Sequence, residues 1–228
     1  MTSNDPCDTG HCFLCRNCLP EWKGAIAAAR QVLHYKKGQM IFREGMEVRG
    51  IYFIIKGGVK VHQSWAKDKE IVLRFSTAGD VLGHRGQGGS ATYPVSATAL
   101  EQTSVCFISA GFLETTIKTN PSFLFAMMQL YATELQKADW RMRSLALTPV
   151  KGRVAEALLT IREIFGSDDE GYVRIPITRL DIACYAGTTY EAVFRLMTEW
   201  IAEGLVSTSG KYIRINDDKK LNDLLNNP

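Results

Sequence analysis

The chain has 228 residues, enough for one large domain or two smaller ones with separate hydrophobic cores. Its formal net charge is only +3, which excludes a chain-wide polycation, so a surface for nucleic acid would have to be a local patch. The sequence has no apolar run of about 18 residues and no secretory signal at its start, which argues against a membrane span and predicts a cytoplasmic protein.

The N-terminal stretch CDTGHCFLCRNC is unusually rich in cysteine. It holds Cys7, Cys12, Cys15 and Cys18, four of the six cysteines in the chain. Cytoplasmic thiols are kept reduced, so clustered cysteines there more often bind a metal or sense redox state than form structural disulfides. A metal site, a redox switch and chance clustering all remain open on this pattern alone.

Residues 31–109 have the pattern of β structure. Apolar segments of strand length alternate with glycine-containing turns, as in GQMIFREG, GIYFIIKGGVKV and GDVLG. Short strands at such close intervals predict a compact antiparallel barrel or sandwich.

A short helix is predicted over FLETTIKTN and a long helix over residues 122–147. In the long helix, apolar residues recur at alternating steps of four and three, the a/d pattern of a two-helix coiled coil. We therefore expect a homodimer, the alternative being a helix that packs only on its own barrel. Trp140, Arg141 and Arg143 lie off this seam and are expected to be exposed. The seam consists of Leu124, Met128, Tyr131, Leu135, Ala138, Met142 and Leu145.

The break at Thr148-Pro149 predicts a hinge between two domains. After it, VKGRVAEALLTIREIFG is typical of an amphipathic helix that ends at Gly166. The stretch YVRIPIT then predicts a strand, because its apolar residues alternate with polar ones.

Residues 178–206 fit a helix-turn-helix. Thr178 is a suitable N-cap for the first helix, Gly187 suits the tight turn, and Thr189 caps a second helix that extends to about Glu203. The stretch GLVSTSGKYIRI that follows predicts a two-stranded wing. The predicted buried stripe of the second helix is Val193, Leu196, Met197 and Ile201.

The outer face of this second helix carries Tyr190, Glu191 and Arg195 near its start. Arginine matches the acceptors of guanine and glutamate accepts from cytosine, so Glu191 and Arg195 together can read G·C pairs. The alternative is an i,i+4 surface ion pair without DNA. Candidate phosphate contacts, any of which could be only a solvated surface residue, are Thr178, Arg179, Thr188, Thr189 and Lys211.

Taken together, these pieces resemble the CRP/FNR family of bacterial transcription regulators over about residues 30–216. The resemblance implies an α+β fold: an N-terminal double-stranded β-roll like a cyclic-nucleotide-binding jelly roll, a long dimerisation helix and a C-terminal winged helix-turn-helix. The implied domains are a cysteine-rich segment (1–22), the β-roll (23–120), the dimerisation helix (121–148) and the DNA-binding domain (149–228). Family members bind palindromic double-stranded operators as dimers, and RNA polymerase is an expected partner.

The cyclic-nucleotide branch of the family has a Glu and an Arg-Ser pair after the GD..G motif. Here His84 stands at the Glu position and Tyr93-Pro94 at the Arg-Ser position. A cyclic phosphate would therefore lack its Arg fork, and we expect no cyclic AMP or GMP. A small organic effector in the roll is an alternative to be weighed.

The cysteines instead resemble those of the oxygen-sensing FNR branch. Cys106 in TSVCFIS aligns with the central cysteine that completes the [4Fe-4S] site of that branch, which implies a cluster on Cys12, Cys15, Cys18 and Cys106 that responds to oxygen or nitric oxide. Cys7 is a possible substitute, because the last gap of this C-x2-C-x2-C run is narrower than in the FNR pattern. A structural zinc and metal-free thiols are the alternatives.

The reading helix also resembles FNR-like readers of TTGA-type half-sites, in which Glu and Arg share the central G·C pair. Tyr190 replaces the first base-reading Arg of the cyclic-AMP branch. We expect no enzyme, because Cys12-Phe13-Leu14-Cys15 lacks a thioredoxin-like context and no Ser-His-Asp or metal-hydrolase spacing occurs.

Overall fold

The computed structural model describes residues 10–65, 69–89 and 91–226. The chain divides into two compact units. The first comprises Met1–Gln63 and Ser76–Gln136, and the second Ser64–Phe75 and Lys137–Pro228. Among the described residues no helix combines the length and the apolar character needed to cross a bilayer.

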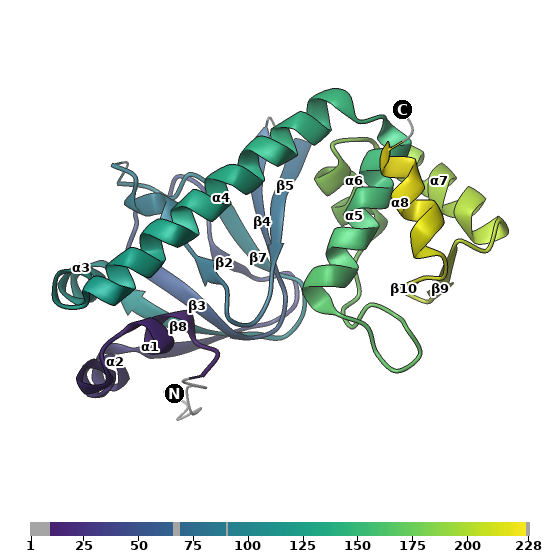
Figure 1. Cartoon of the computed structure of the whole chain (residues 1–228). Helices are drawn as coiled ribbons and strands as arrows, with labels where there is room; N and C mark the ends of the chain where they lie inside the picture. Colours follow the sequence, from purple (N-terminus) through teal and green to yellow (C-terminus); the bar gives the residue numbers. More distant parts are fainter. Residues whose placement is uncertain (1–9, 66–68, 90, 227–228) are drawn as a thin grey trace. The chain divides into compact units, whose positions relative to one another are not determined.

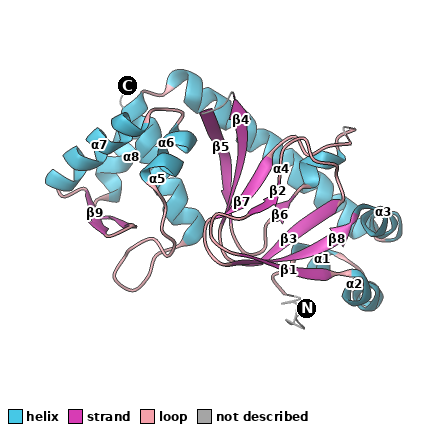
Figure 2. Ribbon diagram, turned by 180° about the vertical axis from the view of Figure 1, so that it is seen from behind, coloured by secondary structure: helices cyan, strands magenta, loops and turns pink. Residues whose placement is uncertain are grey.

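A β-roll of two four-stranded sheets, most of it in the first unit, confirms the β structure expected over residues 31–109 (Figures 1 and 2). One sheet has the order β1-β8-β3-β6, formed by Gln31–Tyr35, Thr103–Ser109, Gly50–Lys56 and Val81–Leu82. The other has the order β2-β7-β4-β5, formed by Met40–Phe42, Ser96–Ala99, Val59–Trp65 and Lys69–Ser76. The strand pairs of the roll described in register are antiparallel.

The central strands β3 and β8 are buried on both faces, which explains their continuous apolar sequences. Side chains alternate along a strand, so neighbouring residues serve different layers. Tyr52 stacks on Phe42 of the other sheet, with ring centroids 5.4 Å apart. Phe53, opposite Cys106 in the β3–β8 register, belongs instead to a buried cluster shared with helices.

The helices that share this buried cluster are the N-terminal helices, α3 and the start of the long helix. Figures 1 and 2 show α1 and α2 beside β1, β3 and β8. The elements are α1 (Phe13–Asn17), η1 (Pro20–Trp22), α2 (Lys23–Ala29), α3 (Ala110–Thr119) and α4 (Pro121–Leu147), and a further turn, η2 (His84–Gln87), follows β6. Asn120-Pro121 separates α3 from α4, as the sequence predicts.

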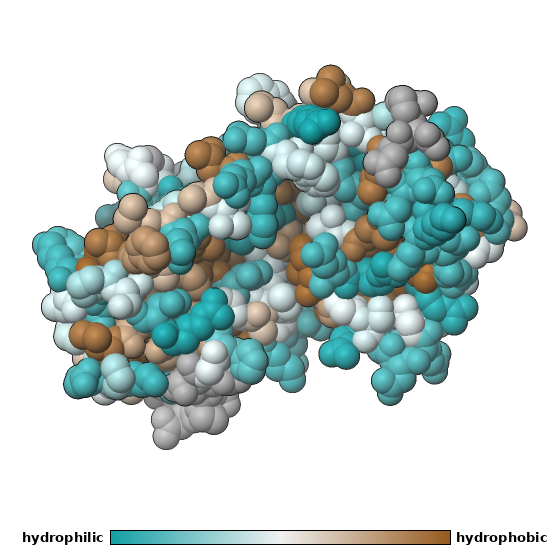
Figure 3. All heavy atoms as spheres, viewed as in Figure 1, coloured by the Kyte–Doolittle hydropathy of each residue, from teal (hydrophilic) through white to brown (hydrophobic). Residues whose placement is uncertain are grey.

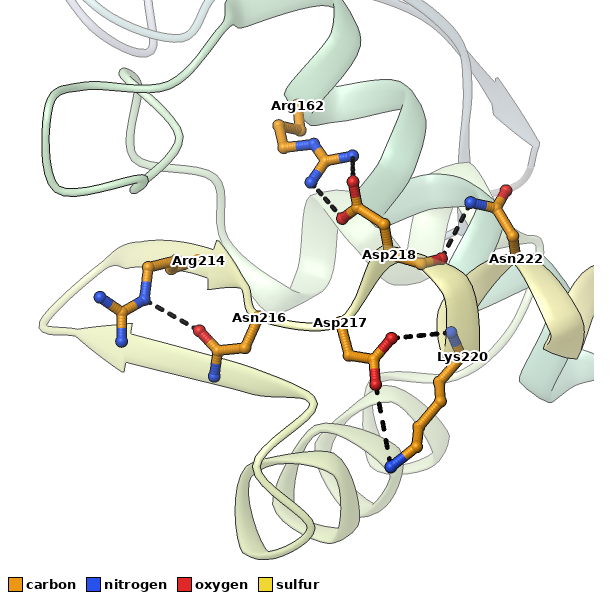
Figure 4. A network of polar contacts seen from close by, with 7 residues as sticks. All are labelled: Arg162, Arg214, Asn216, Asp217, Asp218, Lys220 and Asn222. Atoms are coloured by element: carbon orange, nitrogen blue, oxygen red, sulfur yellow. Dashed lines mark hydrogen bonds and ion pairs between the residues drawn. The ribbon is translucent and has the colours of Figure 1, made fainter.

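The second unit contains the winged helix-turn-helix and confirms the C-terminal fold class. Its elements are α5 (Val150–Phe165), α6 (Arg179–Ala186), α7 (Tyr190–Ala202), β9 (Val206–Ser209), β10 (Tyr212–Ile215) and α8 (Asp218–Asn226). Helix α8 lies against α5, where Arg162 binds Asp218 with both guanidinium nitrogens (Figure 4). Gly152 permits this approach, because a Cβ there would lie 2.8 Å from the Leu224 carbonyl oxygen.

The strand predicted over YVRIPIT does not form. The segment makes only isolated bridges, Ser167 to Val173 and Tyr172 to Arg214. Its alternation is nevertheless real: Val173, Ile175 and Ile177 are buried and line a small apolar cavity with residues of α5 and β10. The apolar face therefore packs between α5 and β10, and Pro176 has no N–H for a ladder.

Residues at the end of α4 pack against α5 and α6. The prediction that Arg141 is exposed is wrong, because its side chain is only 11% exposed and its Cζ lies 4.0 Å from the Tyr185 ring centroid. Arg141 Nη1 is 3.6 Å from Oε1 of the buried Glu156, whose Oε2 accepts a hydrogen bond from Ser144 Oγ. Trp140 and Arg143 are exposed, as predicted.

Candidate nucleic-acid interface and cysteine segment

The turn between α6 and α7 has the local features that the sequence predicts. Thr178 Oγ1 accepts from the Asp181 amide, and the Asp181 carboxylate accepts from the Thr178 amide, which completes a capping box. Gly187 ends α6 with a φ of +59°, a left-handed conformation that suits glycine. Thr189 then caps α7 by accepting from the Ala192 amide.

Helix α7 buries one face and exposes the other. Val193, Leu196 and Met197 are buried as expected, but Ile201 is 38% exposed and Trp200 is fully buried in its place. Two helical turns are closer to seven residues than to eight, so the stripe that starts at Val193 returns at residue 200. The predicted base-reading residues Tyr190, Glu191 and Arg195 are all exposed.

Phe194 is a further residue of this exposed face that the sequence reasoning missed. Its side chain is 47% exposed, and its ring stacks on Tyr190 with centroids 6.3 Å apart. The guanidinium carbon of Arg179, on α6, lies 5.0 Å from the Phe194 ring centroid. Phe194 follows Tyr190 by four residues, and this i,i+4 spacing on a predicted outer face was the available signal.

The predicted phosphate contacts lie at several places around the helix-turn-helix. The Thr178 hydroxyl donates to Asp181 as well as accepting from it, so it serves the capping box. Thr188 and Thr189 occupy the turn, and Thr189 uses an oxygen lone pair for its cap. Lys211 is exposed between β9 and β10. Their contacts with phosphate stay predictions.

The wing is fixed by Asn216, which follows β10. Asn216 Nδ2 donates to the Gly204 carbonyl at 3.0 Å and to Ser207 Oγ at 2.7 Å. Its Oδ1 accepts from Arg214 Nε at 2.9 Å (Figure 4). These bonds tie both strands of the wing to the end of α7.

Arg153 holds the helix-turn-helix against the hinge. It donates to the carbonyl of Thr148 at 2.7 Å, and to those of Ala186 and Gly187 at 2.7 and 3.2 Å. The first carbonyl belongs to the α4–α5 break and the other two to the α6–α7 turn. One guanidinium therefore satisfies acceptors in both segments.

The predicted dimer seam is largely exposed in the single chain. Leu124, Met128, Leu135 and Met142 are exposed, with Leu135 at 64%. Figure 3 shows hydrophobic residues, in brown, at several places along α4. Tyr131 is partly covered and donates to the His84 carbonyl at 2.7 Å. Ala138 is exposed, whereas Leu145 is half-buried and limits the space beside Gly187.

The segment that would hold a cyclic phosphate is occupied by structural contacts. The Tyr93 hydroxyl donates to the Gly50 carbonyl at 2.8 Å, and its ring stacks on Phe42. His84 is buried, with Nε2 3.8 Å from Glu134 Oε2. Arg85 donates to the same Glu134 oxygen at 3.0 Å. Side chains of the roll and of α4 thus bind each other here.

The cysteine segment packs into the first unit. Cys12 is the N-cap of α1, and Cys15 and Cys18 are buried in the same cluster as Cys106 of β8. The fold therefore brings the remote cysteine and the N-terminal ones to one face of the β3–β8 sheet. Cys7 lies outside the described residues. Cys184 is half-buried in α6.

Contacts outside the thiols anchor this segment to the helices of the unit. Phe13 packs edge-on against Phe123 of α4, with ring centroids 6.1 Å apart. The Leu19 amide donates to Asn120 Oδ1 at 2.9 Å, and Trp22 Nε1 donates to Thr116 Oγ1 at 3.1 Å. Packing and hydrogen bonds thus hold the segment on the roll.

The described N-terminal cysteines and Cys106 lie among apolar side chains in this structure. Within the described ranges, no group of three or more His, Cys, Asp or Glu side chains is gathered as metal ligands would be. Burial is the main cause that raises the pKa of Cys18 to about 11, and the nearby Cys12 is the second cause. These surroundings favour the protonated thiol of Cys18 over its thiolate.

Comparison with known proteins identifies both halves of the chain. Residues 32–120 match the model of the cyclic nucleotide-binding domain, and residues 152–224 match that of the Crp-like helix-turn-helix domain.

The chain is also similar to individual regulators. It is 30% identical to Electron transport regulator A of Shewanella oneidensis, over 84% of this chain and 77% of that protein. It is 29% identical to the Fumarate and nitrate reduction regulatory protein of Escherichia coli K12, over 82% of this chain and 75% of that protein. The structure of FixK2 from Bradyrhizobium japonicum superposes with a TM-score of 0.76. The two chains are 24% identical, and the match covers 86% of this chain and 96% of FixK2. The chain belongs to the CRP/FNR family of DNA-binding transcription regulators.

Proposed function

We propose that the chain acts as a homodimer that reads a palindromic operator of TTGA-type half-sites through α7, with the cysteine segment as its sensing part. The observation that carries the DNA-reading proposal is the exposed face of α7, where Glu191 and Arg195 stand one turn apart beyond a fully capped turn. Side chains at this spacing can reach neighbouring base edges in a major groove.

The dimer proposal is supported by the exposed apolar residues of α4. A single helix with Leu124, Met128, Leu135 and Met142 in water leaves a large apolar stripe uncovered. Packing two copies of this stripe against each other would cover it and would present two copies of α7 to the two half-sites.

The experiment for DNA reading is a binding titration of the full chain with a duplex containing two TTGA half-sites. Arg195→Ala is expected to remove specific binding, since one bidentate arginine–guanine pair contributes about 1–3 kcal/mol per half-site. Glu203→Ala, an exposed residue after the end of α7, is the matched control and should bind normally. Equal affinity of native protein for the palindrome and for scrambled DNA would contradict the proposal.

For sensing, the FNR-branch resemblance assigns a [4Fe-4S] cluster to Cys12, Cys15, Cys18 and Cys106. The burial of Cys15 and Cys18 in one cluster with Cys106 supports a shared role for these thiols. Iron and sulfide analysis after anaerobic purification distinguishes the possibilities. About four irons per chain would support the cluster. Stoichiometric zinc would support a structural metal site. A protein with neither iron nor zinc would support a sensor that uses the thiols themselves.

Single Cys→Ser variants identify the residues that matter. If a cluster is present, loss of iron in the Cys106→Ser variant would assign the remote ligand. Cys184→Ser is the control, because Cys184 lies in α6 and belongs to the other unit. A small organic effector in the roll would instead give a colourless protein whose operator binding depends on an added metabolite extract.

A further inference from the structure

The outer face of α7 carries a pair of aromatic rings beside its charged residues. Tyr190 and Phe194 are 44% and 47% exposed, and their rings stack with an interplanar angle of 29°. Phe194 has no polar atom in its side chain. A ring of this kind held in water on a surface that must contact DNA is suited to an apolar partner.

The position of the Phe194 ring is defined on two sides. Tyr190 stacks on it from one helical turn earlier, and the Arg179 guanidinium lies over it from α6. The Thr189 cap fixes the first turn of α7, from which Tyr190 projects. These contacts hold the aromatic pair in place before any DNA is bound, so little side-chain freedom remains to be lost.

The major groove presents one prominent apolar group, the C5 methyl of thymine, and phenylalanine is among the side chains that contact it. Phe194 directly precedes Arg195 and lies three residues after Glu191, so it projects toward the base pairs next to those that the charged pair would read.

We infer that Phe194, backed by Tyr190, is a specificity-determining residue that reads the methyl group of a thymine flanking the G·C pair in each half-site. The inference rests on the proposed DNA-reading function and extends it to a base that the charged residues do not select. Arg179 then has a second role, since it orients the ring as well as lying near the DNA backbone.

The experiment removes only the methyl group. The full chain first selects duplexes from a random-sequence pool, and each thymine of the selected palindrome is then replaced by uracil. Loss of one buried methyl is expected to weaken binding about 4-fold for one half-site and about 15-fold for both. Phe194→Ala should bind the thymine duplex correspondingly more weakly and should no longer distinguish thymine from uracil.

Two further measurements keep the outcomes separate. Circular dichroism checks that Phe194→Ala is folded, and Tyr190→Phe, which keeps the stacked ring, should retain full sensitivity to the methyl group. Failure of the native protein to enrich any sequence overturns the proposed function together with this inference. Specific binding that is insensitive to every uracil overturns the inference alone, as does a methyl effect that persists in Phe194→Ala.

Discussion

The contact between Arg141 and Glu156 gives a stability prediction that can be worked out from the structure. The two side chains are 11% and 5% exposed, and their charged atoms are 3.6 Å apart. At an effective dielectric constant of about 20, Coulomb attraction at this distance is about 4–5 kcal/mol. Arg141→Met removes the cation and leaves a buried carboxylate, whose hydrogen bond in the structure comes from Ser144. We expect a loss of about 3–5 kcal/mol in the opening free energy of α5 and α6.

Hydrogen exchange of the full chain, followed by mass spectrometry, measures that opening free energy in peptides covering α5 and α6. Peptides from β3 and β8, in the first unit, serve as the internal control and should change by less than about 0.5 kcal/mol. The double variant Arg141→Met/Glu156→Leu removes both charges, so it should be several kcal/mol more stable than the sum of the single changes implies. Additive losses, or a loss below about 1 kcal/mol in Arg141→Met, would show that the pair is not buried as described.

Three other changes give distinct outcomes. Leu135→Glu places a charge in the α4 seam and should give a monomer in analytical ultracentrifugation, whereas the neighbouring Gln136→Glu should stay dimeric; a dimeric Leu135→Glu protein would place the interface elsewhere. Lys211→Ala should weaken binding to all duplexes about equally and reduce the slope of log K against log salt by about one per half-site, and an unchanged slope would remove Lys211 from the phosphate contacts. Asn120→Ala removes the acceptor of the Leu19 amide and should make the Leu19–Lys23 segment more sensitive to limited proteolysis. Thr115→Ala, at an exposed residue of α3 whose hydroxyl donates to the Gly111 carbonyl, is the control.

The sequence predicts most elements of the fold because their signals are local. Thr178 and Thr189 cap helices through bonds to residues three positions ahead, and Gly187 stands where a left-handed turn is required. The seam in α4 and the glycine-separated strands are likewise periodic patterns within one segment. Such features depend on neighbours in the chain, so one sequence is sufficient to find them.

The errors have the opposite origin. YVRIPIT alternates like a strand, but its buried residues pack between α5 and β10 without forming a ladder. Arg141 looks like a solvated residue until Tyr185 and Glu156 are brought beside it by the fold. Each of these depends on long-range packing that no local pattern encodes.

The hydrogen bonds of Arg153 have a consequence for how a signal could reach DNA. One guanidinium binds carbonyls of both the α4–α5 break and the α6–α7 turn, so it joins these two segments directly. A rotation of the end of α4 about its own axis would then also move the α6–α7 turn and, with it, the start of α7. In a dimer, the orientation and separation of the two α7 helices would then depend on how the two α4 helices are twisted about each other. A twist of a few degrees could then decide whether both readers fit successive major grooves, about 34 Å apart.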